Sequence, residues 1–509
     1  MRTIGKFIVL FLALGMLAYR STAQTNIFPS DPLLDLLIKK GYVSEDEAKK
    51  VRAEAAAAQT NSTDFARSKW SIGNGFKKGE FFGDIRLRFD QRTVHSPNGS
   101  RFELDRLRYA ARVGLRADLV GDFYFGLRLE TASNPRSSWV NFATSTSGAP
   151  YSGPFGKASA GIGVGQLYIG YKPKPWLDIT LGKMPNPLYT TAMLWDPDLN
   201  PEGAAERFNL KVGEAELFAT FGQFYYEDVN PTRSAAFLVP TMPAGADAPS
   251  PWLFAWQLGA NYHINQDLSA KAAATIYNYT SHGANSQTGS SVLSPGFNGP
   301  YVGEGATNFS GSSGFPSGPN NGFAFNQTGI NDLLVLDFPF ELNFKISDYR
   351  ARFFGDFAMN LDGAERARAA VNGAANNTSM KLTLPLQKND DKAYQFGFAF
   401  ANGDNINTVN NANNHRGGWE TRVYWQHVEQ YAIDPNLMDS DFFEGRENLE
   451  GIYVAAAYSM TDNIIGTVRF GHAWRINPAL GTGGANQDIP FINPIRDYQI
   501  IQADLSCKF

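Results

Sequence analysis

From residue 80 onward, apolar and polar residues alternate one by one along much of the chain. Over residues 105–119, leucine, valine, alanine and tyrosine fill one set of alternate positions, and arginine dominates the other set. After a tight turn at 120–122, the alternation continues to residue 130. Successive side chains of a β-strand point to opposite faces, so this period of two predicts antiparallel strands with one apolar and one polar face.

The lengths of the connections between these strands also alternate. Short turns are predicted at 120–122, 172–175, 212–214, 265–267, 347–348 and 461–463, and long connections rich in Gly, Asn, Ser and Pro at 91–103, 132–165, 184–206, 228–252, 281–330, 362–391, 429–447 and 476–496. Such alternation is typical of outer-membrane barrels, which have short periplasmic turns and long extracellular loops. We therefore expect an all-β fold, a transmembrane antiparallel β-barrel of about 16 strands over residues 80–509, with 14 or 18 strands as alternatives. Segment 402–416 is a misfit, because it is long but falls on the short-turn side.

A soluble β-sandwich or β-helix would also alternate, so two further features are needed to separate the classes. The chain ends on Phe509, with Ile501, Ala503 and Leu505 on the same face, which resembles the carboxyl-terminal signal read by barrel assembly machinery. Aromatic residues gather near strand ends, as membrane interfaces favour; they are Tyr171, Trp176, Trp256, Tyr262, Trp419, Trp425, Trp474 and Tyr498. These features favour a barrel in the lipid bilayer of the bacterial outer membrane.

The amino-terminal segment has a different character. A basic start, an apolar run over 7–18 and the small residues before position 24 predict a signal peptide over 1–23. A retained membrane anchor is the alternative, but the apolar run is shorter than the roughly 20 residues that a spanning helix needs. Residues 24–60 carry helix-start signals at Asp31-Pro32 and at Ser44 with Glu47, so we expect a short α-helical periplasmic prefix. A polar linker over 61–79 follows it.

Distinctive short patterns recur in the first strands and the loop after them. They are GDIRLR at 83–88, DRLR at 105–108, RVGLRA at 112–117, GLRLET at 126–131, GKMPNP at 182–187 and WDPDLNPEG at 195–203. On these residues, over roughly 31–56 and 80–210, the chain resembles the putative porin family of Gram-negative bacterial outer membranes. The resemblance implies a 16-stranded general porin-like barrel, a homotrimer, that passes small hydrophilic solutes or ions by diffusion.

The polar face of a barrel lines water, and its charges set selectivity. On the first three strands this face carries seven arginines that we expect to line the pore: Arg86, Arg88, Arg106, Arg108, Arg112, Arg116 and Arg128. The net charge of -4 hides this local basic excess. Two readings stay open: the arginines favour anions, or they pair with carboxylates across the strands.

The third long connection carries four acidic residues: Asp196, Asp198, Glu202 and Glu206. In general porins the third loop folds inward and faces an arginine cluster. The resemblance therefore implies a constriction loop opposite Arg106, Arg108 and Arg112, and opposed charges of this kind create a transverse field. The alternative for Asp196-Pro197-Asp198 is a plain turn or a weak cation site.

Other kinds of site have little support in the sequence. The six histidines show no metal-type spacing: His95, His263, His282, His415, His427 and His472. No Gly-x-Ser-x-Gly elbow or phosphate-binding loop is present, and the net charge gives no basic excess for nucleic acid, so we expect no metal, no cofactor and no enzyme. A porin is the function we expect. Two alternatives are an outer-membrane barrel acting as an adhesin or cell-envelope structural tether, and a secreted carbohydrate-binding protein.

Overall fold

The structure is a computed structural model, and it describes only part of the chain. The described residues are 40, 76–97, 99–132, 137–142, 161–226, 252–280, 333–368, 390–402, 415–478, 480–482, 488–489, 492 and 494–509. The predicted signal peptide, the helical prefix apart from residue 40, and most of the linker lie outside them. Contacts divide the chain into two units, Met1–Glu80 and Phe81–Phe509. The first strand begins at Phe76, within the predicted linker.

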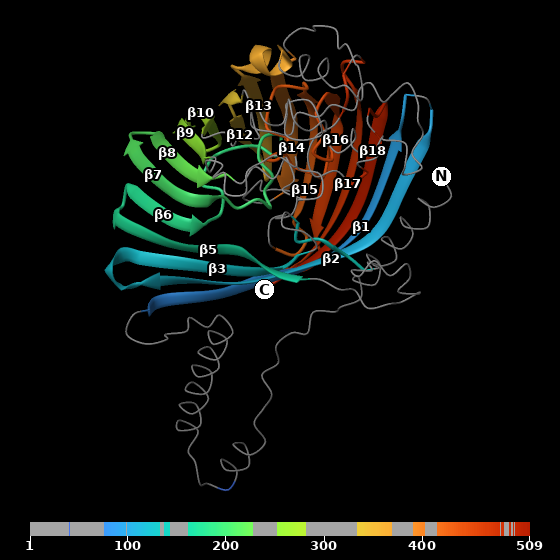
Figure 1. Ribbon diagram of the computed structural model, residues 1–509. Coiled ribbons are helices and arrows are strands. Elements are labelled where there is room, and N and C mark those ends of the chain that lie inside the picture. The colour runs from blue at the N-terminus through green and yellow to red at the C-terminus, as the bar shows by residue number, and fades with distance from the viewer. Residues whose placement is uncertain are drawn as a thin grey trace, which may run out of the picture. The chain divides into compact units, whose positions relative to one another are not determined.

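The described residues form one antiparallel sheet of 18 strand segments (Figure 1). The segments are β1 (Phe76–His95), β2 (Arg101–Leu119), β3 (Phe123–Ala132), β4 (Val140–Asn141), β5 (Gly161–Lys174), β6 (Leu177–Lys183), β7 (Glu202–Val212), β8 (Ala215–Tyr225), β9 (Trp252–His263), β10 (Leu268–Thr280), β11 (Leu334–Asp337), β12 (Phe340–Ile346), β13 (Tyr349–Asn360), β14 (Lys392–Asn402), β15 (Trp419–Val428), β16 (Leu449–Ser459), β17 (Ile464–Arg475) and β18 (Asp497–Lys508). A 3₁₀ turn, η2 (Val120–Asp122), joins β2 to β3.

The 18 segments make 16 wall strands, as the sequence predicts. The two-residue β4 pairs only with Arg108 and Tyr109 of β2. Segments β11 and β12 both pair with β10 and with β13, so they are two parts of one strand interrupted at Phe338 and Pro339. Counted this way, the described part of the chain has 16 strands that each follow the previous one around the sheet.

The first and last strands close the sheet into a barrel. β1 pairs with β18 from Asp84 opposite Lys508 to His95 opposite Asp497. The Phe509 amide donates to the Gly83 carbonyl at 3.0 Å, and the Gly83 amide donates back at 2.9 Å. Gly83 is required here, because a Cβ at this position would lie 2.6 Å from the Phe509 ring. Closure satisfies the backbone hydrogen bonds that an edge strand would leave open, a condition for crossing a bilayer.

The apolar residues of the wall point outward. Leu181, Leu258 and Ile162 are 57%, 63% and 79% exposed although they are large and apolar, and similar side chains line the outer face of most strands. Inside, the connections between the strands bury their own apolar residues, including Phe442, Phe443 and Ile489. An outer apolar surface with a polar and loop-filled interior is the arrangement of a barrel in lipid.

Two local predictions are wrong. Residues 91–103 are not a long connection, because β1 runs to His95 and β2 begins at Arg101. Tyr498 is not an interfacial aromatic, because it is completely buried inside the barrel. Within the described residues, no helix is long and apolar enough to cross a bilayer.

Candidate pore constriction

Loop 184–201, between β6 and β7, crosses the interior of the barrel. Near its start, Tyr189 and Gln257 of β9 form two hydrogen bonds, from the Tyr189 amide to Gln257 Oε1 and from Gln257 Nε2 to the Tyr189 carbonyl, both at 2.8 Å. Further on, the Thr191 hydroxyl donates to the carboxylate of Asp356 on β13. At its end, Asp198 Oδ1 lies 3.0 Å from Arg112 Nη1 on β2. The loop is therefore anchored to widely separated strands of the wall.

A second inward loop, 429–448 between β15 and β16, meets the first. The Asp196 amide donates to the Leu437 carbonyl at 2.6 Å, and the Asp439 amide donates to the Ala192 carbonyl at 3.1 Å. Both loops carry an Asp-x-Asp turn in which the second amide donates to the first carboxylate: Asp198 to Asp196 at 2.8 Å, and Asp441 to Asp439 at 3.0 Å. The two loops thus bring four carboxylates to one region.

The arginines of β1 and β2 bind carboxylates of the wall and of the inward loops. Arg88 Nε lies 2.8 Å from Asp504, and Arg88 Nη1 lies 2.9 Å from Asp441. Arg106 Nη2 lies 2.5 Å from Asp90 and 2.6 Å from Asp488 of the connection between β17 and β18. Charge-assisted pairs of this length are strong and directional. These arginines fasten the loops to the wall.

The predicted opposition between loop 184–201 and the arginine cluster is present at one point only. Arg112 contacts Asp198, whereas Arg106 binds Asp90 and Asp488. Arg108 lies 3.7 Å from Asp90, and its guanidinium carbon is 5.9 Å from the centre of the Trp139 ring. Arg106 does not face loop 184–201 because it is paired with Asp488 at 2.6 Å instead.

The remaining predicted residues lie elsewhere on the wall. Arg116 stacks on the Phe82 ring at 4.2 Å, and Arg128 Nη2 lies 3.2 Å from Glu130. The predicted end of the third connection is wrong, because β7 begins at Glu202. Glu206 pairs across the strands with the outward residue Ile179 and accepts a hydrogen bond from Gln223 at 2.8 Å. Glu202 lies 2.6 Å from Lys183.

Between the loops and the wall lies a cavity of about 370 Å³. Its basic side consists of Arg86 and Arg88 of β1 with three arginines of later strands: Arg352, Arg422 and Arg469. Its acidic side includes both Asp-x-Asp turns and Glu341: Asp196, Asp198, Asp439, Asp441 and Glu341. The three later arginines and Asp439 and Asp441 were not predicted as site residues. A signal for two of the arginines was present, because Arg352 and Arg469 each stand between apolar residues, as in Val468-Arg469-Phe470.

The loop carboxylates have different pKa values because their surroundings differ. Burial, together with the neighbouring charge of Asp441, raises the pKa of Asp439 to about 7. Burial and the charges of Asp439 and Asp198 raise the pKa of Asp196 well above its usual value. Burial also acts on Asp441, but Arg88 and other arginines outweigh it and lower its pKa. Negative charge in the cavity therefore changes near neutral pH through Asp439.

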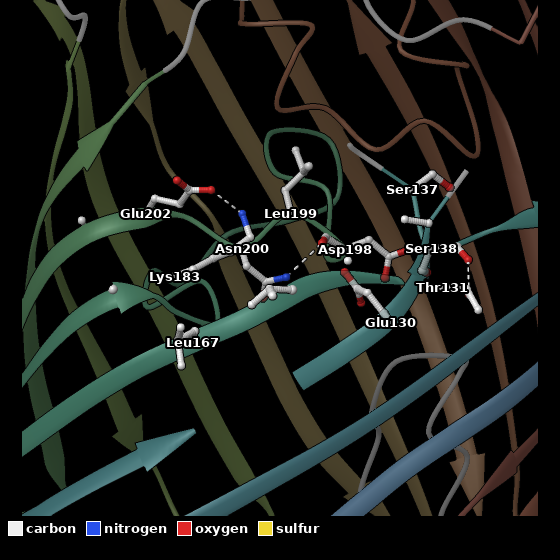
Figure 2. Close-up of a pocket in the computed structure, with 15 residues that line it drawn as sticks. Glu130, Thr131, Ser137, Ser138, Leu167, Lys183, Asp198, Leu199, Asn200 and Glu202 are labelled. Atoms are coloured by element: carbon white, nitrogen blue, oxygen red, sulfur yellow. Dashed lines mark hydrogen bonds and ion pairs between the residues drawn. The ribbon is translucent and has the colours of Figure 1, made fainter. Parts of the chain in front are cut away.

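A second cavity, of about 730 Å³, lies beside the end of loop 184–201 and strands β3 and β5 (Figure 2). Asp198 and Asn200 of the loop line it together with Glu130 of β3, and the Lys183–Glu202 pair lies at its margin. Asp198 lines both cavities. Among the described residues, no group of three or more His, Cys, Asp or Glu side chains could hold a metal ion.

A closed antiparallel barrel that is apolar outside and holds charged cavities behind inward loops defines a class: the β-barrel proteins of the bacterial outer membrane. Within that class, residues 94–509 match the family described as putative porin. The chain belongs to this family and is, at the general level, an outer-membrane porin. Family membership indicates a channel rather than an enzyme.

Solved structures of outer-membrane proteins resemble the chain distantly. OmpT of Vibrio cholerae, in its outer-membrane expressed form, has a TM-score of 0.39 at 9% identity, and the match covers 87% of this chain and 100% of that one. Salmonella typhi OmpF in complex with daunomycin has a TM-score of 0.38 at 8% identity, covering 86% and 100%. No curated protein sequence matches the chain.

Proposed function

We propose that this porin is a water-filled channel for passive diffusion of small hydrophilic solutes, with a weak preference for anions. The cavity of about 370 Å³ carries the proposal, because it lies inside the barrel and is bounded by five arginines. Polar walls with charges of both signs suit hydrated solutes, and they repel apolar ones. The five acidic groups on the same lining explain why the preference is weak.

In this proposal loop 184–201 is the constriction loop, with Asp196 and Asp198 as its charged residues. Loop 429–448 contributes Asp439 and Asp441 to the same constriction. Support comes from the two backbone hydrogen bonds that join the loops, at 2.6 and 3.1 Å. Glu202 and Glu206 have no part in it, since both belong to β7.

Conductance of the purified full chain in planar bilayers tests the channel. We expect stable single-channel steps from the wild type and noisier, larger steps from Gln257→Ala, which removes both side-chain bonds to Tyr189 and leaves two backbone groups unpaired. Gln499→Ala, on the outer face of β18, is the matched control and keeps the wild-type steps. Absence of conductance from correctly folded protein would contradict the channel.

We also propose that the porin is a homotrimer and that Phe509 is its signal to the barrel assembly machinery. The hydrogen-bonded pair Glu206–Gln223 on the mostly apolar outer face of β7 and β8 supports the trimer, because a subunit contact would shield this polar pair from lipid. The pairing of Phe509 with Gly83 supports the second proposal, since the last residue completes the closure of the barrel. Light scattering of the detergent-solubilised protein, and the outer-membrane yield of a chain lacking Phe509, test the two proposals separately.

A further inference from the structure

Arginine and alanine alternate across five neighbouring strands of the inner wall. Arg352 of β13 lies opposite Ala399 of β14, which in turn lies opposite Arg422 of β15. Arg422 lies opposite Ala455 of β16, which lies opposite Arg469 of β17. Residues directly opposite in antiparallel strands share a face. The three arginines, which we call the arginine row, therefore lie in one row across the inner face of the wall, with only methyl groups between them.

The spacing of the row suits a ligand with more than one negative charge. Neighbouring strands lie about 4.8 Å apart, so successive arginines of the row start roughly 10 Å apart. An ion-paired oxygen lies about 2.8 Å from each guanidinium group, which leaves roughly 4 to 5 Å between two anionic groups held by neighbouring arginines. The carboxylates of a four-carbon diacid have about this separation. All three arginines line the cavity of about 370 Å³.

One buried phenylalanine ring lies beside two members of the row. The guanidinium carbons of Arg352 and Arg422 lie 5.1 and 5.5 Å from the centre of the Phe354 ring. The ring is fixed because it covers Gly397, where a Cβ would lie 2.4 Å from it. Two like charges on one ring repel each other in a poorly solvated cavity, and an anion between them relieves that repulsion.

Glu341 makes the row selective for ligand charge. Its Oε2 lies 3.4 Å from Arg352 Nη1, and it lines the same cavity. A singly charged anion must compete with this carboxylate for one arginine. Arg422 is paired in the same way, with Glu420 at 3.4 Å. An anion with two or three carboxylates can replace both long contacts at once and gains two arginines, whereas a singly charged anion gains one. At the other end of the row, Arg469 is bound to Asp504 at 2.5 Å, so we take Arg469 as the end of the row.

We propose that the arginine row is a binding subsite for short di- and tricarboxylates on their way through the channel. The proposal rests on the porin function proposed above and assigns it a substrate class.

The test is block of the wild-type channel by succinate, citrate and acetate in planar bilayers at constant ionic strength and pH, with neutral succinamide as reference. We expect citrate and succinate to reduce the current at concentrations at least tenfold below acetate. Arg352→Gln with Arg422→Gln should raise the half-blocking concentration of citrate about tenfold or more. Arg350→Gln is the matched control, because Arg350 lies on the same face of β13 but does not line the cavity; its block should stay within twofold of wild type.

Glu341→Gln provides an independent test with the opposite sign. It should lower the half-blocking concentrations of succinate and acetate, and acetate should gain more, because the competing carboxylate is gone. Equal block by acetate and succinate in the wild type, or citrate block unchanged in the double variant, would overturn the subsite and leave the porin function intact. A wild-type protein without any channel would overturn both.

Discussion

Two groups of arginines face the interior from the same wall, and they are held in different ways. On β1 and β2, Arg88 and Arg106 each bridge two carboxylates at 2.5 to 2.9 Å. On β13 and β15, Arg352 and Arg422 share the Phe354 ring and lie 3.4 Å from Glu341 and Glu420. The comparison shows that arginines on the inner face of the wall have two different roles. The first group fastens loops, although Arg88 also lines the cavity, whereas the second lines the same cavity and pairs with carboxylates of the wall strands.

The difference follows from where the loops pack. Asp441 of loop 429–448 and Asp488 of the next connection both lie against β1 and β2. Their carboxylates neutralise the arginines there. Loop 184–201 reaches β13 through Thr191 and Asp356 instead, and leaves the cavity beside Arg352 open. Substitutions in the two groups should therefore have separable effects on stability and on selectivity.

The largest effect is expected from Arg88→Leu. Arg88 is buried and holds Asp504 and Asp441 together, so its loss leaves buried charge uncompensated, at a cost of about 3 to 5 kcal/mol in the free energy of unfolding. Urea unfolding in detergent, followed by tryptophan fluorescence, measures it. Arg350→Gln is the control. If Arg88→Leu lowers the free energy of unfolding by less than about 1 kcal/mol, the first group of arginines does not hold the loops as described.

A smaller effect is expected from pH. Because the pKa of Asp439 is raised to about 7, its carboxyl is neutral below that pH and charged above it. Anion preference should therefore weaken as pH rises from 6 to 8, and Asp439→Asn should remove most of the change. The free energy of unfolding should also fall as pH rises. The folded state keeps the Asp439 proton up to about pH 7, whereas the unfolded chain releases it above about pH 4, so stability is lost as pH rises from 4 to 7. Asp267→Asn, on an exposed turn, is the control; an unaltered pH profile in Asp439→Asn would exclude Asp439 as the titrating group.

The smallest effect is expected from Arg108→Gln, next to Arg106 on the same face. Its contacts are long, 3.7 Å to Asp90 and 5.9 Å to the Trp139 ring, so the variant should lose less than about 1 kcal/mol. Arg106→Gln, which loses contacts of 2.5 and 2.6 Å, should lose clearly more. The two variants are compared by the temperature at which the folded barrel loses its faster migration in gel electrophoresis. Equal losses would mean that contact length does not separate these arginines.

Local sequence patterns predicted most of the fold but only part of the candidate site. The period of two and the alternating connections predict the 16 wall strands, because both are properties of short segments. The pairing of Asp439 with loop 184–201 could not be predicted, because it joins residues from loops far apart in the sequence. The same holds for the arginine row, which depends on the register across β13 to β17. The bounds of β7 were missed because Glu202 and Glu206 resemble loop acids in a one-dimensional pattern.

The reversal potential in a tenfold KCl gradient tests the central claim most directly. Two charge-matched variants are compared with wild type: Arg352→Gln with Arg422→Gln, and Arg116→Gln with Arg128→Gln. We predict that the first moves clearly toward cation selectivity and the second moves little, since Arg116 and Arg128 do not line the cavity of about 370 Å³. A shift in the second variant equal to or larger than that in the first would contradict the account.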